Sequence, residues 1–500
     1  MSETRPVTVA ERSEYRMTSR HEDVLRFIEE LRGRRTCFRV ESMGRSGLGQ
    51  EMPVLVFGER PGTPVVLVLA NIHAGEVEGK ESLLMLARDL PESLFERLTL
   101  LFVPDYNPDG NDRIDVRNRA LDLERLEGQI GPEGGVGTRY TGQGINLNRD
   151  YVKLEAPESR NLSRLYGRWR PHLTVDCHTT DGSIHRFALT YDTSHIPTPP
   201  CEYVRTRMLP EVSRRLEGRT GLRTFFYGNF VDEKDPSKGW ATYPHLPRYG
   251  SHYRGLTGRM DILLESYSYI PFRERVAVTT EILREIFDYS IANAGDLLRL
   301  CAEQERARPD PVPVAFGVPE ADGECEIPVW DEESQAARRI PGREPRTVRI
   351  PHRWKFSPSR TVPRPFAYVL RRDQEAAIRI LREHNVAVER LAAGATLEAE
   401  AYRVASIRRV DSPDAGSAPR EETVVGVRPE RVFSGLEAGD ALVRTDQPLG
   451  TLVSYLLEPE SDDGLARWGF FDAALGEGQV FPVLRIPPAR AGELPAAAPY

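Results

Sequence analysis

The stretch that decides the fold is VVLVLANIHAGEVEGKESLLML, residues 65–86. Residues 63–70 form an apolar run that predicts a buried strand, and the apolar spacing over residues 76–90 predicts a helix. A second apolar run, LTLLFVP at residues 98–104, follows that helix. This order predicts a βαβ unit, from which parallel sheets with helices on their faces are built.

His73 and Glu76 lie three residues apart in the turn between this strand and this helix. Neutral imidazole nitrogen and carboxylate oxygen are ligands that zinc accepts at about 2.0–2.2 Å, and a pair that straddles a turn can converge on one point. The pair alone is more typical of a solvated histidine followed by a glutamate that favours the helix dipole. A metal site therefore needs a further ligand from another strand.

His178 is the candidate for that ligand, because it ends the apolar run in VDCHTTDG, residues 175–182. In open α/β sheets, sites form at the carboxyl ends of strands. Two histidines and one carboxylate leave a coordination position open, which is typical of catalytic zinc. Asp176 shares a strand face with His178 and could orient it, whereas Cys177 is expected to be a small buried side chain.

Glu265 stands at the end of another apolar run, in DILLESYSY, residues 261–269. An ionised carboxylate beside a core strand costs several kcal/mol unless it is paired or lies near a metal. We therefore expect Glu265 to face the metal site and to act as general base on a water molecule. The alternative is a strand-end glutamate in solvent.

A glycine-rich segment at residues 135–159 carries Arg139, Asn148 and Arg149. An Asn-Arg pair in such a loop suits a carboxylate, because guanidinium binds carboxylate bidentately. Arg139 could point at a developing oxyanion. Taken one at a time, these arginines are better explained as surface charges.

Together these segments resemble the zinc metallocarboxypeptidases of the carboxypeptidase A type, in their bacterial or cytosolic branch. Six pieces match in order: GRSGLGQEMPVLVFG, NIHAGEVEG, VPDYNPDGNDR, GINLNRDY, DCHTT and LLESYSY. The resemblance covers about residues 16–300. It implies an α/β fold with a mixed, mostly parallel sheet flanked by helices.

The resemblance also implies a metal site and a base. His73, Glu76 and His178 would bind one zinc ion. Glu265 would be the general base and later the general acid. The family often has an aspartate that orients a zinc-bound histidine where this sequence has Asn146; an amide oxygen can accept the same hydrogen bond but raises ligand basicity less.

The resemblance also implies which residues would bind the carboxylate and the scissile carbonyl of the substrate. Asn148 and Arg149 would hold the free carboxylate of a peptide or small amide substrate. Arg139, ten residues before Arg149, would polarise the scissile carbonyl, with Arg119 as the alternative.

The side chain that caps the substrate would be a tyrosine. Tyr253 is the first candidate and Tyr249 the second. Arg254 and Arg259 lie nearby in the sequence and could favour substrates with acidic side chains.

The composition indicates which classes of partner and which cellular compartment to expect. The chain has 500 residues and a formal net charge of −8, without a basic block, which argues against a nucleic-acid partner. Its five cysteines are scattered and form no CxxC pair, which fits a reducing compartment. No apolar run indicates a signal peptide or a membrane span. A cytoplasmic protein without membrane contact is expected, and nothing in the sequence indicates an oligomeric state.

Changes in composition along the chain also predict its domain boundaries. Residues 1–15 are predicted to be a tail, 16–300 the carboxypeptidase-like domain, and 301–364 a Pro- and Arg-rich linker or covering segment without long periodic elements. Residues 365–487 are predicted to be a smaller α+β or mostly β accessory domain, and 488–500 a second tail.

The sequence thus predicts a zinc-dependent peptide hydrolase that releases C-terminal residues by a metal-activated water. A zinc deacylase of N-acyl amino acids, of the desuccinylase or aspartoacylase type, is the alternative, because it shares the HxxE and D-x-H-T patterns. The NPDG and NLNRD segments favour the peptidase. A non-catalytic binding protein on the same scaffold is a third possibility, although the three ligands and the base are all present.

Overall fold

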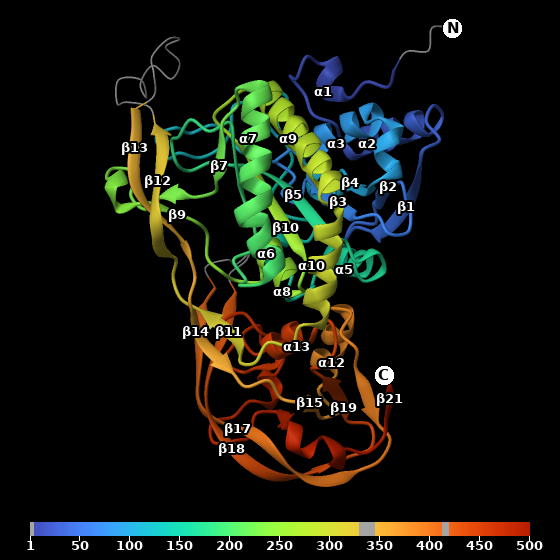
Figure 1. Ribbon diagram of the computed structural model, residues 1–500, viewed down its shortest axis with the longest axis vertical. Coiled ribbons are helices and arrows are strands. Elements are labelled where there is room, and N and C mark those ends of the chain that lie inside the picture. Colours follow the sequence, from blue (N-terminus) through green and yellow to red (C-terminus); the bar gives the residue numbers. More distant parts are fainter. Residues whose placement is uncertain (1–4, 330–345, 413–419) are drawn as a thin grey trace.

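The computed structural model describes residues 5–329, 346–412 and 420–500. Figure 1 shows two parts, one above the other. The N-terminal part, residues 5–306, surrounds an eight-stranded sheet, and the C-terminal part, residues 365–500, surrounds a seven-stranded sheet. The predicted fold class, a mixed and mostly parallel sheet flanked by helices plus a smaller β-rich part, is confirmed. No helix among the described residues is long and apolar enough to cross a membrane.

The eight-stranded sheet has the order β1-β2-β4-β3-β5-β10-β6-β7. Its strands are β1 (Phe38–Arg45), β2 (Glu51–Phe57), β3 (Val65–Ala70), β4 (Thr99–Val103), β5 (Leu173–Thr180), β6 (Leu189–Asp192), β7 (Thr224–Phe226) and β10 (Met260–Tyr267). The central strands β4, β3, β5 and β10 run parallel. Because β3, β5 and β10 are neighbours, their carboxyl ends meet at one edge of the sheet.

Helices cover both faces of this sheet. They are α1 (Val9–Arg12), α2 (His21–Arg32), α3 (Glu78–Asp89), α4 (Pro108–Asn111), α5 (Pro157–Trp169), α6 (Pro199–Tyr203), α7 (Leu209–Thr220), α8 (Gly250–Leu256), α9 (Phe272–Ala292) and α10 (Ala294–Arg306). Short 3-10 turns lie at η1 (Glu92–Glu96), η2 (Leu147–Arg149) and η4 (Pro236–Lys238), and a π-helical turn, η3 (Val204–Met208), joins α6 to α7. Along β3, Val66 and Val68 pack with α2, α3 and α9, while Leu67 and Leu69 face the layer of α5 and α8. This alternation follows from the two-residue period of a strand.

Residues 301–364 contain more regular structure than the sequence predicts. Four strands lie here, β11 (Val312–Phe316), β12 (Glu320–Val329), β13 (Arg346–Lys355) and β14 (Pro358–Val362). β13 pairs with β12 and also with β9 (Trp240–Ala241), and β9 pairs with β8 (Asn229–Phe230). Strands β12 and β13 therefore extend a small sheet of the N-terminal part (Figure 1). Much of β12 is exposed and therefore polar, which hides it from an apolar pattern. Residues 330–345 lie outside the described residues.

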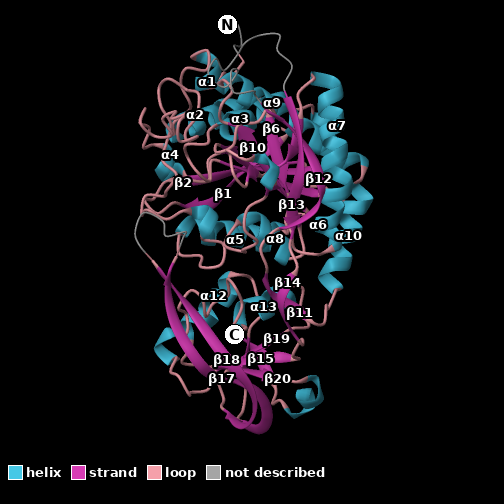
Figure 2. Ribbon diagram, turned by 90° about the vertical axis from the view of Figure 1, so that its left-hand side faces the viewer, coloured by secondary structure: helices cyan, strands magenta, loops and turns pink. Residues whose placement is uncertain are grey.

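The described residues of the C-terminal part form an antiparallel sheet with two helices. Its strand order is β18-β17-β20-β15-β19-β16-β21. The elements are β15 (Ala367–Leu370), α12 (Glu375–Glu383), β16 (Glu389–Leu391), β17 (Ala395–Asp411), β18 (Glu421–Leu436), β19 (Ala441–Arg444), α13 (Gly450–Leu457), η5 (Asp472–Ala474), β20 (Val483–Ile486), η6 (Pro488–Glu493) and β21 (Ala497–Pro499). The long β17–β18 hairpin rises from this part toward the N-terminal part (Figure 2).

Neither predicted tail is without structure. At the C-terminus, β21 pairs with β16. Near the N-terminus, Thr8 and Glu11 form a capping box at the start of α1, and Ala10 is fully buried. Residues 1–4 of that predicted tail lie outside the described residues.

The two parts share one hydrophobic cluster. It runs from one face of the large sheet through Leu162 of α5 to Leu381 of α12 and into α13. Polar contacts reinforce it, because Ser163 donates a hydrogen bond to the carbonyl of Glu383 and Asn385 donates one to the carbonyl of Ser163. The buried cluster packs the two parts against each other and does not leave them joined only by a linker.

Gly79 allows α3 to approach the sheet closely. A Cβ added at Gly79 would lie 2.4 Å from the Cβ of Cys177, which is buried as predicted, and 3.0 Å from that of Ala70. Gly79→Ala should therefore lower the free energy of unfolding in urea by about 1–3 kcal/mol, because it overpacks this contact.

The matched control is Gly295→Ala in α10, where an added Cβ meets nothing within 4 Å. That variant should be as stable as the wild type or slightly more stable. Unchanged stability of Gly79→Ala would contradict the close packing of α3 on β5.

Candidate active site

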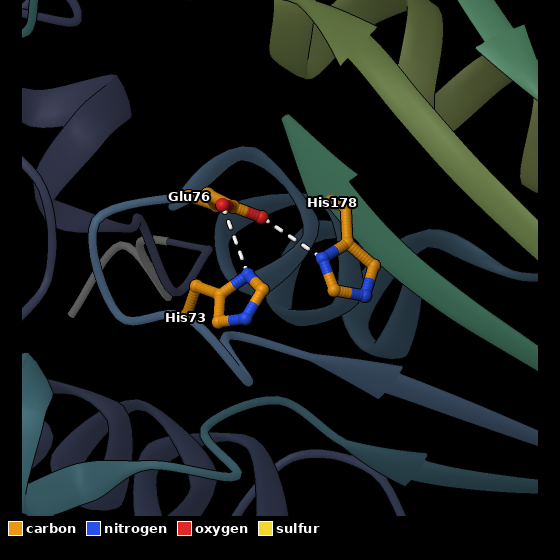
Figure 3. Close-up of side chains that lie close together, drawn as sticks. All are labelled: His73, Glu76 and His178. Carbon is orange, nitrogen blue, oxygen red and sulfur yellow. Dashed lines mark hydrogen bonds and ion pairs between the residues drawn. The ribbon is translucent and has the colours of Figure 1, made fainter. Parts of the chain in front are cut away.

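Three side chains with metal-binding groups meet at the carboxyl ends of β3 and β5 (Figure 3). His73 and Glu76 lie between β3 and α3, and His178 lies in β5. One ligand atom from each lies within 4.8 Å of the others, and all three residues are buried. The two carboxylate oxygens of Glu76 lie 3.0 Å from Nδ1 of His73 and 2.9 Å from Nδ1 of His178.

A tight turn after β3 produces this arrangement. Asn71 has a φ of +66°, a conformation that asparagine tolerates better than most residues. Its side chain donates a hydrogen bond to Asp105 at 2.7 Å. The N–H of Glu76 donates to the carbonyl of His73 at 2.9 Å, which closes the turn and brings both side chains to one side.

The outer nitrogen of each imidazole faces an oxygen. Nε2 of His73 lies 3.1 Å from Oδ1 of Asn146, and Nε2 of His178 lies 3.4 Å from Oδ1 of Asp176. The acceptor on Asn146 and the nearby charge of Asp176 favour the tautomer with the proton on Nε2, which leaves the lone pair of each Nδ1 directed at the centre. Two such nitrogens and a carboxylate are the donor set that zinc prefers, so the residues fit this metal.

Burial and neighbouring charges shift the pKa values of all three triad residues. Burial raises the pKa of Glu76, but the two imidazoles outweigh it and hold this pKa well below its ordinary value. Burial and the charge of Arg139 lower the pKa of His73 to about 3, so that imidazole is neutral. Around His178 burial opposes a positive charge, yet Asp176 and Glu76 raise its pKa well above the ordinary value. Glu76 is therefore ionised and can offer its negative charge to a metal ion.

A cleft of about 410 Å³ opens over this triad. Its lining residues are His73, Glu76, Arg119, Arg139, Asn148, Arg149, His178, Thr179, Thr180, Asp181, Gly182, Tyr227, Asn229, Tyr243, Tyr249, Ser251, Leu263 and Glu265. The structure thus brings seven of the eight predicted site residues into one cleft; the exception is Tyr253.

Asn148 and Arg149 form one wall of the cleft with the start of α8. Oδ1 of Asn148 accepts a hydrogen bond from the N–H of Gly250 at 3.0 Å. The guanidinium carbon of Arg149 lies 4.0 Å from the ring centroid of Tyr249. A terminal nitrogen of this guanidinium also donates to the carbonyl of Asn148 at 2.8 Å. These contacts fix the orientation of a positive charge that can attract a carboxylate in the cleft.

Glu265 lies on β10 directly opposite His178 in the parallel pairing of β10 with β5. Its side chain is half-buried at the edge of the cleft. Burial and the neighbouring Glu76 raise the pKa of Glu265 to about 8, although His178 opposes the rise. A carboxyl group so close to the triad is placed to exchange a proton with a water molecule in the cleft.

The two candidate arginines differ in their contacts. Arg119 donates to Glu76 at 3.2 Å and is also bound to Gln129, to Ser268 and to the carbonyl of Thr179. Arg139 reaches Glu76 at 3.4 Å, and 39% of its side chain is exposed, compared with 18% for Arg119. Arg139 is therefore better placed to turn toward a substrate.

The first choice for the capping tyrosine does not match the structure. Tyr253 is buried outside the cleft, where its hydroxyl lies 2.7 Å from Nδ1 of His384 in the C-terminal part. The alternative, Tyr249, lines the cleft at the N-cap of α8. The specificity candidates also lie elsewhere: Arg254 binds Asp176 and Asp261, and Arg259 binds Glu305.

Several residues that line the cleft were not predicted from the sequence. The N–H of Thr179 donates to Glu76 at 3.2 Å, and this residue directly follows His178. Tyr227, Tyr243 and Ser251 line the cleft from loops and from α8, and no motif marks them. Only the fold brings these positions together.

Residues 24–186 match the family model described as zinc carboxypeptidase, Peptidase M14. This region belongs to the zinc carboxypeptidase family. The three metal-site residues lie within the zinc carboxypeptidase region and are typical of the zinc site of this family. Glu265 and Tyr249 lie outside it.

Curated relatives match over short stretches. Human carboxypeptidase Z is 29% identical over 161 residues, which are 29% of this chain and 23% of the relative. Carboxypeptidase 2 of Trichophyton tonsurans is 27% identical over 119 residues, 23% of this chain and 18% of the relative. The chain therefore spans about a fifth of the length of these relatives.

Solved structures match over longer stretches at lower identity. A metallo-carboxypeptidase from Burkholderia cenocepacia is 17% identical with a TM-score of 0.39, covering 54% of this chain and 69% of that chain. A metallo-carboxypeptidase from Pseudomonas aeruginosa is 17% identical with a TM-score of 0.39, covering 55% of this chain and 69% of that chain.

Asn146 should tune the affinity of the triad for zinc. Its amide oxygen accepts from His73 and also from the backbone N–H of Asn148 at 3.0 Å. Asn146→Ala should weaken zinc binding about 10–100-fold, because it removes the acceptor that orients His73. Asn146→Asp should bind zinc at least as tightly as the wild type. Competition with a chromogenic chelator measures the zinc affinity of both variants.

The control is Asn161→Ala, since Asn161 is buried away from the cleft and donates to the carbonyl of Arg45. That variant should keep the wild-type affinity for zinc. Wild-type affinity in Asn146→Ala would show that Asn146 does not orient the ligand.

Proposed function

We propose that this protein is a zinc-dependent carboxypeptidase that hydrolyses the last peptide bond of peptides with a free C-terminus. The observation that carries the proposal is the position of Asn148 and Arg149 in the same cleft as the metal triad and Glu265. A carboxylate-binding pair at that place selects substrates that end in a carboxylate.

In this proposal the protein's own groups bind and orient the substrate. Arg149 and Asn148 donate hydrogen bonds to the terminal carboxylate, and the ring of Tyr249 shields this end of the cleft. The guanidinium of Arg139 donates to the carbonyl oxygen of the scissile bond and stabilises the charge that develops on it.

Glu265 transfers the proton in this proposal. Its carboxylate accepts a proton from the attacking water and returns it to the nitrogen of the leaving amine, so that one water is consumed and an acid and an amine are released. His73, Glu76 and His178 would hold the zinc ion, which would supply a Lewis acid that lowers the pKa of a water toward about 7 and would favour the ionised form of the nearby Glu265.

Glu265→Gln tests the role of the base. The amide cannot accept the proton, so kcat should fall by about 10²–10⁴-fold while zinc stays at one ion per chain, measured by plasma mass spectrometry. Glu281→Gln on α9, whose carboxylate binds Arg219 away from the cleft, is the matched control and should keep the wild-type rate. A wild-type rate in Glu265→Gln would remove Glu265 from the mechanism.

Substrate choice separates the peptidase from the deacylase. Initial rates of amide hydrolysis are compared for N-acetyl-Gly-X dipeptides and for the corresponding N-acetyl amino acids, with X varied over acidic, basic, aliphatic and aromatic residues. The proposal expects release of X from the dipeptides at a much higher kcat/KM. A preference for the N-acetyl amino acids would favour the deacylase, and protein that binds no zinc would favour a binding role.

A further inference from the structure

Arg248 is the residue directly before Tyr249, and its side chain leaves the cleft for the C-terminal part. Its guanidinium binds Asp463 at 2.8 Å and Glu422 at 2.8 Å, and its backbone N–H also donates to Asp463. All three side chains are about 1% exposed or less. An arginine and two carboxylates are thus fully buried between the two parts.

Trp468 extends this contact to Lys153, which lies next to Arg149. Its indole N–H donates to Asp463 at 3.0 Å, and the guanidinium of Arg248 lies 4.5 Å from its ring centroid. Nζ of Lys153 lies 4.0 Å from the same ring. That ammonium group also donates to the carbonyl of Arg149 at 2.6 Å. One tryptophan of the C-terminal part therefore contacts cations next to both Tyr249 and Arg149.

His384 provides a second contact from the C-terminal part. Its Nδ1 accepts the hydroxyl of Tyr253 at 2.7 Å, and its Nε2 lies 2.9 Å from the carbonyl of Val152. Burial lowers the pKa of His384 to about 4, so the ring is neutral and can accept at one nitrogen while it donates at the other. Val152 follows Arg149 by three residues, and Tyr253 follows Tyr249 by one helical turn.

These contacts reach segments that contain only short elements of regular structure. Asn148 and Arg149 lie in a single 3-10 turn, and Tyr249 lies at the N-cap of the seven-residue helix α8. The metal triad is different, since its residues lie in β5 and at the turn between β3 and α3. Burying an arginine with two carboxylates costs free energy through desolvation, so such a cluster is weak evidence for stability and better evidence for positioning.

We propose that residues 365–500 are a positioning element for substrate binding, and that Asp463, Glu422 and Trp468 hold Arg248 and Lys153 so that Tyr249 and Arg149 face the substrate's terminal carboxylate. This inference rests on the proposed function. It assigns the C-terminal part to binding of the carboxylate end of the substrate, whereas the metal and the base stay with the large sheet.

The test substitutes Asp463→Asn, which keeps the shape of the side chain and removes its charge. KM for the best N-acetyl-Gly-X dipeptide should rise about tenfold, because small displacements of orienting groups weaken binding strongly. The value of kcat should stay within about threefold and zinc at one ion per chain, since neither Glu265 nor the triad contacts Asp463. If Asp463 had only a structural role, the substitution would lower the melting temperature without raising KM selectively over kcat.

Asp446→Asn is the matched control. Asp446 is exposed and binds Arg308 at 2.7 Å, outside the cleft, so its KM and kcat should equal those of the wild type. Trp468→Phe is a second variant that keeps an aromatic ring and removes the N–H to Asp463; its KM should also rise. It keeps the proposal testable if Asp463→Asn does not fold.

Binding without turnover separates this inference from the proposed function. The same dipeptide is titrated by calorimetry into Glu265→Gln and into Glu265→Gln combined with Asp463→Asn. About tenfold weaker binding in the double variant is expected. Equal affinity within twofold in a folded double variant would overturn the positioning role and leave the peptidase intact. Absence of binding to Glu265→Gln itself would overturn the proposed function and this role with it.

Discussion

The site depends on the burial of one carboxylate, that of Glu76, at the end of the large sheet. An isolated carboxylate there would be very costly, so it must be surrounded by donors and positive charge. Two imidazoles, the N–H of Thr179 and two arginines provide this environment. The turn after β3, the parallel pairing of β3 with β5 and the length of β5 are all needed to bring these groups to one point.

The central strands and the metal site could be predicted from the sequence for a physical reason. Parallel strands buried on both faces appear as continuous apolar runs, and their carboxyl ends meet at one edge. His178 and Glu265 interrupt or end such runs, and His73 follows one, so local patterns place all three residues. Strands β12, β13 and β14 escaped this reasoning, because strands with an exposed face carry polar and charged side chains. The run of β11, VPVAF, is apolar but only five residues long, and it contains a proline.

Side chains that depend on distant partners could not be placed in this way. Tyr249 and Tyr253 are one helical turn apart, and their spacing alone does not show which one lines the cleft. The choice is made by His384, which binds Tyr253 from 131 positions farther along the chain. Likewise, the partners of Arg248 are 174 and 215 positions away. No local pattern predicts such pairings.

The two parts of the molecule thus have different roles in our account. The strand ends of the large sheet hold the metal ligands and the base, and the loops that line the carboxylate end of the cleft are supported by the C-terminal part. Chemistry is assigned to the ends of strands in the large sheet, and recognition to elements that are fixed by contacts between the parts. This division agrees with the general observation that binding residues lie on loops that a rigid scaffold positions.

The most direct measurement of the central claim is digestion of one peptide in two forms, with a free C-terminal carboxylate and with a C-terminal amide, followed by mass spectrometry. The account predicts stepwise loss of residues from the C-terminus of the free form. It predicts little or no cleavage of the amide, because Asn148 and Arg149 then have no carboxylate to bind. Equal cleavage of both forms, or cleavage at internal bonds, would contradict it.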